Sequence, residues 1–360
     1  MHAPVLRSVH RSPRRSASRA GVLLALATTA TLLVSGCAAD DEPATNADGT
    51  TDFGELSVQL SWIKNVEFAG EYFADSKGYY EDAGFSSTNL IAGPGAAESL
   101  VASGQSLVGI SDPISAAPAI VNEGAEVKII GTTYQKNPFS ILSLTDEANI
   151  TTPQDLIGKR IGVQAGNETL FEALLEVNDI DPDDVTVVPV EYDPSPLITG
   201  DVDGFLAYVT NESIIVESQG YDVTNLLYAD NGLEFATESF VVSQDSIDNN
   251  REALKAFLYA SILGWKDAVA DPQGSADLAL DTYGADLGLD ADTQLKQAEA
   301  ANALIETEET DANGLFTISD DLIESNLSVI EASGTTIEAD DLFDMSLLTE
   351  VYEEHPELLE

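Results

Sequence analysis

The sequence predicts an α/β protein built of two lobes, between which the chain crosses twice. Three observations lead to this prediction. Short apolar runs alternate with helical patterns in the first part of the chain, the alternation restarts after residue 145, and the pattern from residue 250 onward is helical. Short strands separated by helices of about ten residues favour right-handed βαβ units and a mostly parallel sheet.

The chain begins with a segment typical of secreted proteins. Five arginines precede the 17 apolar or small residues of AGVLLALATTATLLVSG. That run is shorter than the roughly 20 apolar residues of a membrane-spanning helix, and it ends in small residues. We therefore expect residues 1–36 to be a signal peptide.

The next residue, Cys37, ends the stretch LVSGC, which resembles the bacterial lipoprotein signal, in which this cysteine carries the lipid. A plain signal peptide followed by a chance cysteine is the alternative. Because Cys37 is the only cysteine, intramolecular disulfides and cysteine metal clusters are excluded. Residues 37–54 are small, polar and acidic, which predicts a flexible, lipid-anchored tether.

The chain is strongly acidic, with 63 Asp and Glu against 15 Lys and Arg and a formal charge of −48. Five of those basic residues lie in the signal peptide, so the remaining chain is more acidic still. Such a charge repels nucleic acid and anionic lipid surfaces. We therefore expect no nucleic-acid partner, and contact with the membrane only through the lipid anchor.

The first lobe is expected to comprise residues 55–145 and 238–360. LSVQLSW (56–62) has the period of two typical of a strand, and the aromatic stretch after it fits a helix. Further strands are expected at 87–93, 107–111 and 127–134, with helices at 95–104 and 116–124. The helical segments after residue 250 complete this lobe.

The second lobe is expected to be an insert at 146–237, with strands at 160–164, 185–190 and 203–209. Two apolar strands, FSILSLT (139–145) and ESFVVS (238–243), lie at the junctions and are expected to cross between the lobes. Two crossings of this kind make a hinged clam-shell. In open α/β sheets the ligand lies beyond the carboxyl ends of the strands, which here means the cleft between the lobes.

The sequence offers little for catalysis. After the signal peptide the only histidine is His355, near the end of the chain, where we expect it to be solvated. Serine triads, Cys–His dyads and histidine-ligated zinc are therefore absent. No phosphate-binding loop or nucleophile-elbow motif occurs either. We expect a binding protein rather than an enzyme, with no cofactor and no metal.

Candidate binding residues follow the predicted strands. IAGPGAAES and VQAGNETL place glycine and small residues between a strand and a helix, where backbone N–H groups can face a ligand. Ordinary tight turns explain either loop equally well. A capping role for Asn211 and a helix-dipole role for Glu212 are further alternatives. The candidates at strand ends are Gly93, Ser111, Asp112, Gln135, Gly166, Asn167, Tyr208, Asn211 and Glu212.

The stretch SWIKNVEFAGEYFADSKGYYEDAGF (61–85) holds seven aromatic residues. Helical spacing predicts that Phe68, Tyr72 and Phe73 belong mostly to the core, and Phe68 is also a candidate for the cleft. Trp62 differs, because it is expected at the carboxyl end of the first strand, where the cleft should lie. We expect Trp62 to stack on a flat ligand, a contact worth about 0.5–1.5 kcal/mol beyond the burial of area.

The same stretch resembles the opening of solute-binding proteins related to the yeast thiamine-pyrimidine synthase, which often read W-x-x-N-x-x-x-x-G-x-Y-x-A-x-x-x-G-Y-Y-x-x-x-G. LVASGQSLVGIS, DLIGKRIGV and GDVDGFLAYVTNE match further family stretches in the same order, so the resemblance covers about residues 56–270. It implies a type II periplasmic-binding-protein clam-shell with two interlobe crossover strands. It also implies a monomer that delivers a small molecule to an ABC-importer permease at the extracytoplasmic face of the cell membrane.

The resemblance further implies which residues contact the ligand. Trp62 and Asn65 would line the cleft from the first lobe. Tyr208, Asn211 and Glu212 would line it from the second. The synthase branch carries histidine and a cysteine-rich motif that this sequence lacks, which argues for binding alone and against pyrimidine synthesis.

Three ligand classes remain open at this point. A thiamine pyrimidine precursor leads, since the Glu212 carboxylate is suited to accept two N–H donors of an aminopyrimidine. Riboflavin is the nearest alternative, because it is also planar and rich in hydrogen-bonding edges. A sulfonate or similar anion held by helix N-termini at Gly95 and Asn167 is the third, but the sequence places no arginine in the cleft.

Overall fold

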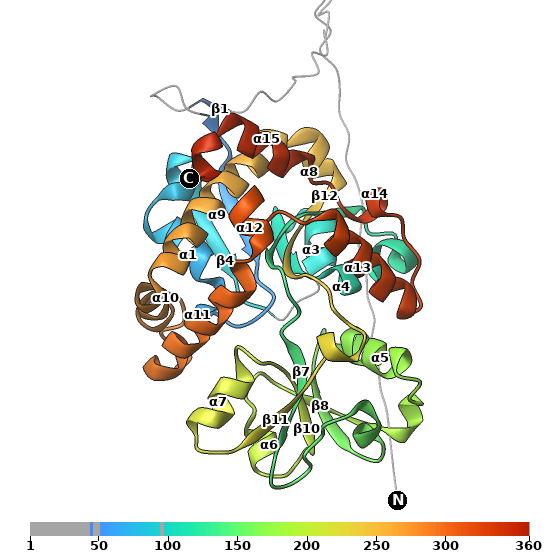
Figure 1. The fold of residues 1–360 in the computed structure, drawn as a ribbon. Helices are drawn as coiled ribbons and strands as arrows, with labels where there is room; N and C mark the ends of the chain where they lie inside the picture. Colours follow the sequence, from blue (N-terminus) through green and yellow to red (C-terminus); the bar gives the residue numbers. More distant parts are fainter. Residues whose placement is uncertain (1–43, 46–50, 94–96, 360) are drawn as a thin grey trace, which may run out of the picture. The chain divides into compact units, whose positions relative to one another are not determined.

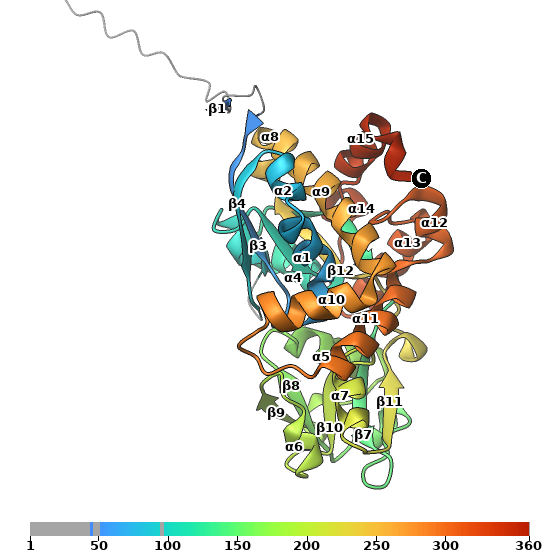
Figure 2. The same ribbon diagram turned by 90° about the vertical axis from the view of Figure 1, so that its left-hand side faces the viewer.

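The computed structural model describes residues 44–45, 51–93 and 97–359. The expected signal peptide, Cys37, most of the tether and Gly95 lie outside the described residues. Pro43–Glu360 forms one compact unit. Within it the chain builds two five-stranded mixed sheets with helices packed around them (Figures 1 and 2). A two-stranded ribbon of β1 (Ala44–Thr45) and β2 (Thr51–Asp52) precedes the sheets.

The first sheet has the strand order β4-β3-β5-β12-β6. Strands β3, β4 and β5 are mutually parallel, whereas β12 runs antiparallel to both of its neighbours. The members of this sheet are β3 (Gly54–Gln59), β4 (Phe85–Ile91), β5 (Val108–Ser111), β6 (Val127–Tyr134) and β12 (Thr237–Ser243).

The second sheet repeats this design with the order β11-β7-β10-β8-β9. Strands β8, β9 and β10 are parallel, and β7 is antiparallel to both β10 and β11. The members of this sheet are β7 (Phe139–Leu144), β8 (Arg160–Gln164), β9 (Thr186–Val190), β10 (Gly204–Tyr208) and β11 (Val223–Leu227).

Each sheet is thus mostly parallel, as expected, with one reversed strand. The reversed strands, β7 and β12, are the ones with which the chain enters a sheet after leaving the other, so they arrive from the opposite side. The crossings themselves are the segments 135–138 and 228–236. Strand β7 is internal to the second sheet and therefore belongs to the second lobe. The sequence analysis had assigned these residues to the end of the first lobe and expected the second lobe to begin at residue 146.

Helices cover both sheets. Those of the first lobe are η1 (Val66–Phe68), α1 (Ala69–Ser76), α2 (Tyr79–Asp82), α3 (Ala97–Ala102), α4 (Pro113–Pro118), η2 (Ala119–Glu123), α8 (Gln244–Asn249) and α9 (Arg251–Ala270). The C-terminal segment adds α10 (Pro272–Leu278), η6 (Ala279–Tyr283), α11 (Ala291–Ile305), α12 (Glu308–Asn313), α13 (Asp320–Ala332), α14 (Ala339–Leu342), α15 (Ser346–Glu354) and η7 (Pro356–Leu359). The second lobe has η3 (Pro153–Leu156), α5 (Glu168–Val177), η4 (Pro182–Asp184), α6 (Ser195–Ile198), α7 (Glu212–Ser218) and η5 (Ala229–Asn231).

The aromatic stretch forms much of the first lobe's core, as its helical spacing predicted. Phe68, Tyr72 and Phe73 are 1%, 0% and 6% exposed. The helix stops at Gly78, whose φ of 77° lies in the left-handed region that favours glycine. Tyr80 follows and stacks on Phe257 of α9, with 6.0 Å between ring centroids. Five of the seven aromatics, Phe68, Tyr72, Phe73, Tyr80 and Phe85, thus belong to this core, whereas Trp62 is only partly buried and packs against it.

Helix α1 packs against α9 at unusually close range. A Cβ atom on Gly264 would lie 2.1 Å from the carbonyl oxygen of Gly70, and one on Gly70 would lie 2.2 Å from the Trp265 ring. Two glycines are therefore needed for the backbones to approach this closely. The contact ties the C-terminal helices to the segment that carries Trp62.

Candidate functional site

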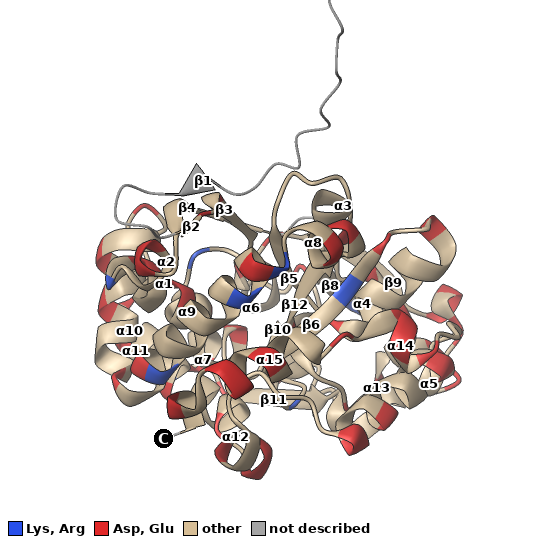
Figure 3. Ribbon diagram, turned by 90° about the horizontal axis from the view of Figure 1, so that it is seen from above, with Lys and Arg blue, Asp and Glu red and all other residues tan. Residues whose placement is uncertain are grey.

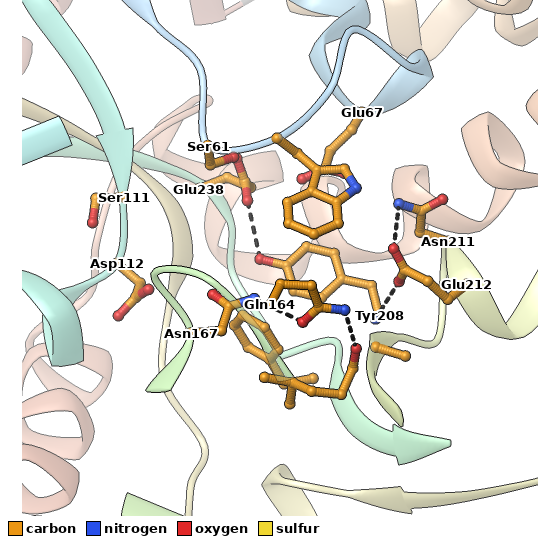
Figure 4. A pocket seen from close by; sticks show the side chains of 14 residues that line it. Ser61, Glu67, Ser111, Asp112, Gln164, Asn167, Tyr208, Asn211, Glu212 and Glu238 are labelled. Carbon is orange, nitrogen blue, oxygen red and sulfur yellow. Dashed lines mark hydrogen bonds between the residues drawn. The ribbon is translucent and has the colours of Figure 1, made fainter. Parts of the chain in front are cut away.

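A cavity lies between the two lobes, and both lobes contribute to its walls (Figure 4). Its space is about 480 Å³, part of which is open to solvent. The lining residues are Ser61, Trp62, Glu67, Ser111, Asp112, Phe139, Gln164, Asn167, Leu206, Ala207, Tyr208, Asn211, Glu212 and Glu238.

Strands of both sheets place their ends at this cavity. β5, β8 and β10 reach it with their carboxyl ends, Ser111, Gln164 and Tyr208. The cavity therefore lies beyond the carboxyl ends of parallel strands, where the sequence analysis expected the cleft. The two reversed strands contribute their amino ends instead, Phe139 of β7 and Glu238 of β12.

The apolar part of the wall is aromatic. Phe139 and Tyr208 are cross-strand partners whose rings meet edge to face, with centroids 4.5 Å apart. Trp62 is half-buried and packs against the core of the first lobe. Such surfaces suit a flat ligand, because stacked and edge-to-face ring contacts are favourable beyond their burial of area.

Gly93 is hydrogen-bonded to the backbone of Trp62. Its N–H donates to the Trp62 carbonyl oxygen at 2.7 Å. A Cβ atom at this position would lie 2.6 Å from the Leu60 carbonyl oxygen, so only glycine permits the approach. Gly93 therefore supports the cavity from behind rather than lining it.

Four carboxyl groups line the cavity, those of Glu67, Asp112, Glu212 and Glu238, and each residue is at most 8% exposed. Burial raises the pKa of Asp112 and of Glu212 to about 7. Burial, together with repulsion from Glu238 and Glu212, raises the pKa of Glu67 well above its usual range. Near neutral pH the cavity therefore offers protonated carboxyls as donors beside carboxylates as acceptors.

Glu238 is held in a left-handed backbone conformation, with a φ of 53°. This conformation is unfavourable for residues other than glycine and is often found at functional sites. One carboxylate oxygen accepts from the Ser61 hydroxyl at 2.8 Å, and the other accepts from the Tyr208 hydroxyl at 3.0 Å (Figure 4). Ser61 belongs to the first lobe and Tyr208 to the second, so Glu238 connects the lobes inside the cavity.

Glu212 is held by two N–H donors. Its Oε2 accepts from the Tyr208 backbone N–H at 2.9 Å, and its Oε1 accepts from Nδ2 of Asn211 at 3.1 Å (Figure 4). Bonds of this kind favour the carboxylate, and the Tyr208 N–H opposes the effect of burial on the pKa of Glu212. Above neutral pH this side chain is an anionic acceptor for a ligand that presents N–H groups.

Lysine and arginine are missing from the cavity wall as the structure describes it. Figure 3 shows that Asp and Glu also predominate over Lys and Arg on the surrounding helices. Over residues 51–93 and 97–359 no group of three His, Cys, Asp or Glu side chains is placed to hold a metal ion. None of the described helices is both long and apolar enough to cross a membrane. The cavity is thus electronegative and aromatic, which disfavours anionic ligands.

Seven of the residues predicted from the sequence line this cavity. Among them, Asp112 also accepts from the Ser115 N–H at 2.8 Å and so caps α4. The Ser111 hydroxyl donates to the Glu98 carboxylate, and Asn167 donates to Oε1 of Gln164 at 3.3 Å. The seven are Trp62, Ser111, Asp112, Asn167, Tyr208, Asn211 and Glu212.

Five predicted residues do not line the cavity, Gly93 among them. Asn65 is 2% exposed and caps η1 by accepting from the Glu67 N–H at 3.1 Å. Phe68 lies in the core of the first lobe. Asn65 thus serves as a helix cap and Phe68 as a core residue, and neither side chain lines the cavity.

The other two residues also have structural roles. Gln135 donates through Nε2 to the carbonyl oxygens of Thr132 and Thr317, which joins the end of β6 to the C-terminal segment. Gly166 is exposed and adopts a φ of 93° in the turn before α5. Its N–H donates to the Glu168 carboxylate at 2.7 Å and not toward the cavity.

Sequence reasoning missed several lining residues. Ser61 and Glu67 lie in the aromatic stretch 61–85, but neither belongs to a motif that indicates ligand binding. Gln164 ends β8 two residues before Gly166, and the strand-end rule alone would have identified it. The full set of missed residues is Ser61, Glu67, Phe139, Gln164, Leu206, Ala207 and Glu238.

Comparison with known proteins gives matches along most of the chain. Residues 65–275 match the family model described as NMT1/THI5 like. A related protein is the riboflavin-binding protein RibY of Chloroflexus aurantiacus, which is 27% identical over 273 residues. That alignment covers 72% of this chain and 76% of the relative.

Solved structures share the fold at lower identity. The periplasmic aliphatic sulphonate binding protein SsuA from Escherichia coli superposes with a TM-score of 0.57 at 16% identity, covering 77% of this chain and 85% of SsuA. The desulfurization enzyme DSZB superposes with a TM-score of 0.54 at 15% identity, covering 83% of this chain and 99% of that enzyme. The expected two-lobed periplasmic-binding-protein fold is thus confirmed. Because one neighbour is a binding protein and the other an enzyme, the likeness shows the fold alone.

Proposed function

This chain belongs to the NMT1/THI5-like family, and from that premise we propose that it is the solute-binding component of an ABC importer, capturing a planar nitrogen heterocycle between its lobes. The observation that carries the proposal is a cavity with an aromatic wall and four buried carboxyls, in which no described lining residue is basic. A flat ring would stack on Trp62 while its N–H edge meets Glu212. Closure of the lobes around the ligand is the state that a permease would recognise.

Riboflavin is the first ligand to test, because RibY, the relative at 27% identity, is named as a riboflavin-binding protein. The flavin ring is planar and carries an imide N–H. A thiamine pyrimidine precursor is the second candidate, and the observation in its favour is Glu212. Its carboxylate, already fixed by two N–H donors, matches the paired N–H groups of an aminopyrimidine.

Sulfonate binding is disfavoured. A sulfonate anion would lie beside four buried carboxyl groups, whose negative charge repels it. No described cavity-lining residue offers a guanidinium or ammonium group to hold the anion. Asn167, the N-cap of α5, lines the cavity, but the Gly166 N–H before it already donates to the Glu168 carboxylate.

Thermal unfolding with a ligand panel tests the proposal. The chain from residue 38 onward is melted with riboflavin, a hydroxymethyl-aminopyrimidine, thiamine, taurine and an alkanesulfonate. A ligand at about 100 times its Kd adds roughly 2.7 kcal/mol, or several degrees of melting temperature. A shift with riboflavin or the pyrimidine supports a heterocycle site. A shift with the sulfonates alone overturns it.

Trp62→Ala is expected to weaken binding of the active heterocycle at least tenfold, because the stacking surface and its buried area are both lost. Isothermal titration measures the change. Trp265 is the only other tryptophan; it lies in α9, and its Nε1 donates to Glu71 at 3.0 Å, away from the cavity wall. Trp265→Phe is therefore the matched control and should leave both the affinity and the ligand-induced fluorescence quenching intact. An unchanged Kd for Trp62→Ala would remove this residue from the site.

We also propose that Cys37 carries a lipid which anchors the protein to the extracytoplasmic face of the cell membrane, where it works as a monomer with its permease. The stretch LVSGC supports this. Cys37→Ser in the native host should release the protein from the membrane fraction into the soluble one, while ligand affinity stays as in the wild type. Retention of the variant in membranes that have been washed with high salt would contradict the anchor.

A further inference from the structure

A series of buried amides runs from the first lobe to Glu212. The Val66 N–H donates to Oε1 of Gln294 at 2.8 Å, and Nε2 of Gln294 donates to Oε1 of Gln297 at 2.5 Å. Nε2 of Gln297 then donates to Oδ1 of Asn211 at 2.7 Å and to its carbonyl oxygen at 3.2 Å. Nδ2 of Asn211 donates in turn to Oε1 of Glu212 at 3.1 Å. The three amide side chains, Gln294, Gln297 and Asn211, are named here the amide relay, and none is more than 6% exposed.

The direction of every bond in the relay follows from its first donor. A backbone N–H can only donate, so Val66 requires Gln294 to present its amide oxygen. Gln294 must then direct its NH2 group to Gln297, and Gln297 must direct its NH2 group to Asn211. Asn211 is left with its NH2 group toward Glu212, which has to accept. A single N–H in the first lobe thus fixes the role of a carboxyl in the second.

We propose that Gln294 and Gln297 are positioning residues of the binding site, which hold Glu212 as a hydrogen-bond acceptor and thereby select ligands that present N–H donors. This inference rests on the proposed function. Neither glutamine lines the cavity, and both lie beyond the residues 65–275 that match the family model. Helix α11, which carries them, contacts η1 in the first lobe and α7 in the second, so the relay also spans the two lobes.

The titratable groups near Glu212 do not keep it in the carboxylate form that accepts hydrogen bonds. Glu67 on η1, Asp112 before α4, Tyr208 on β10 and Glu238 on β12 line the same cavity, and each is an acid. None of them carries a positive charge that would stabilise the Glu212 carboxylate. The backbone N–H groups of Tyr208 and Glu212 lower its pKa against the effect of burial, and the Asn211 amide is the side-chain donor that contacts it.

Gln297→Glu is the decisive variant, because it is isosteric and reverses the relay. One oxygen of the new carboxylate still accepts from Nε2 of Gln294. The other oxygen replaces the NH2 group that faced Oδ1 of Asn211, so two acceptors now face each other. The Asn211 amide then turns its NH2 group toward residue 297 and its oxygen toward Glu212. Glu212 loses a donor and gains a repelling oxygen, so its pKa rises. Gln297→Met, which removes the donor without adding charge, should shift the pKa of Glu212 in the same direction by less.

The experiment has a ligand-free and a ligand-bound part, both made on the full mature chain. The pKa of Glu212 is followed by carboxyl 13C NMR, with the signal assigned by its loss in Glu212→Gln. We expect a rise of at least about one unit in Gln297→Glu, and a roughly tenfold weaker Kd at pH 7.5 for riboflavin or the aminopyrimidine that the wild type binds. Gln219→Glu adds the same charge at an exposed site of the second lobe and should change neither quantity.

The outcomes separate the relay from the proposed function. An unchanged pKa of Glu212 in both Gln297 variants overturns the relay, whatever the protein binds. A raised pKa with an unchanged Kd overturns its role in selecting the ligand. Failure of the wild type to bind any heterocycle overturns the proposed function, and the ligand-free titration still tests the relay on its own.

Discussion

Glu212→Gln is expected to weaken heterocycle binding by about 10- to 100-fold. Glu212 accepts from the Tyr208 N–H and from Nδ2 of Asn211 with different oxygens, and a glutamine can offer only one. Its NH2 group would have to face one of those donors. The ligand N–H would also lose its charged acceptor, and loss of a hydrogen bond to a charged group costs about 1.5–3 kcal/mol, which is a factor of roughly 10 to 150 in Kd.

The measurement is isothermal titration at pH 8, where the wild-type carboxyl is mostly ionised. Glu217→Gln is the matched control, because Glu217 lies on the same helix, α7, but is exposed to solvent. It should bind like the wild type. If both variants bound equally well, Glu212 would have no contact with the ligand, and the aromatic wall alone would have to account for affinity.

The ligand-free protein is expected to lose stability as the pH rises from about 5.5 to 8.5, opposite to ordinary acid denaturation. Burial raises the pKa of Glu71 to about 8 and the pKa values of Asp112 and Glu212 to about 7. In the unfolded chain such groups titrate near about 4. Folding therefore takes up protons. The resulting stability is complete below the unfolded pKa and is lost as the pH rises through 7 and 8.

The loss should be on the order of 7 kcal/mol at most, because the three folded-state pKa values lie about 1.5, 1.5 and 2.5 pH units above pH 5.5 and each unit is worth about 1.4 kcal/mol. Denaturant melts at half-unit pH steps measure it. Most surface carboxylates are already ionised above pH 5.5, so their mutual repulsion is nearly constant in this window. Glu71→Gln should flatten the profile, since Glu71 is fully buried and its Oε2 has no hydrogen-bond partner. A profile that rises with pH would contradict the assignment of protonated buried carboxyls.

Much of the site followed from one rule about strand ends. Ser111, Asp112, Tyr208 and Glu212 were all identified because they lie at or just after the carboxyl ends of predicted strands, and all of them line the cavity. That rule holds for parallel strands only. It could not identify Glu238, because β12 is reversed and meets the cavity with its amino end.

Phe139 was missed for the same reason. It is the first residue of β7, and the antiparallel pairing of β7 with β10 puts it directly opposite Tyr208. The sequence shows that 139–144 is a buried strand, but nothing local in it states the direction in which that strand runs. The direction of a strand within its sheet is set by pairing with segments that are distant in the sequence. The local sequence pattern carries no information about that pairing.

The C-terminal helices were predicted as helices, but their part in the site was not. Gln294 and Gln297 stand among charged and small residues on α11 with no motif around them. Their role depends on which side of α11 meets Val66 and Asn211, and that is decided by the packing of both lobes. In contrast, the core positions of Tyr72 and Phe73 followed from helical spacing alone, because burial of an apolar face does not depend on what covers it.

The insertion of β12 between β5 and β6 has a consequence for how the chain acquires its structure. β6 is paired in its sheet only with β12, which comes about a hundred residues later, after the whole second sheet. As the chain emerges vectorially, the second lobe is complete while β5 and β6 still present unpaired edges. We therefore expect the second lobe to mature first and the first lobe to close last. The interval between them is the period in which a nascent chain is most open to aggregation and to chaperones.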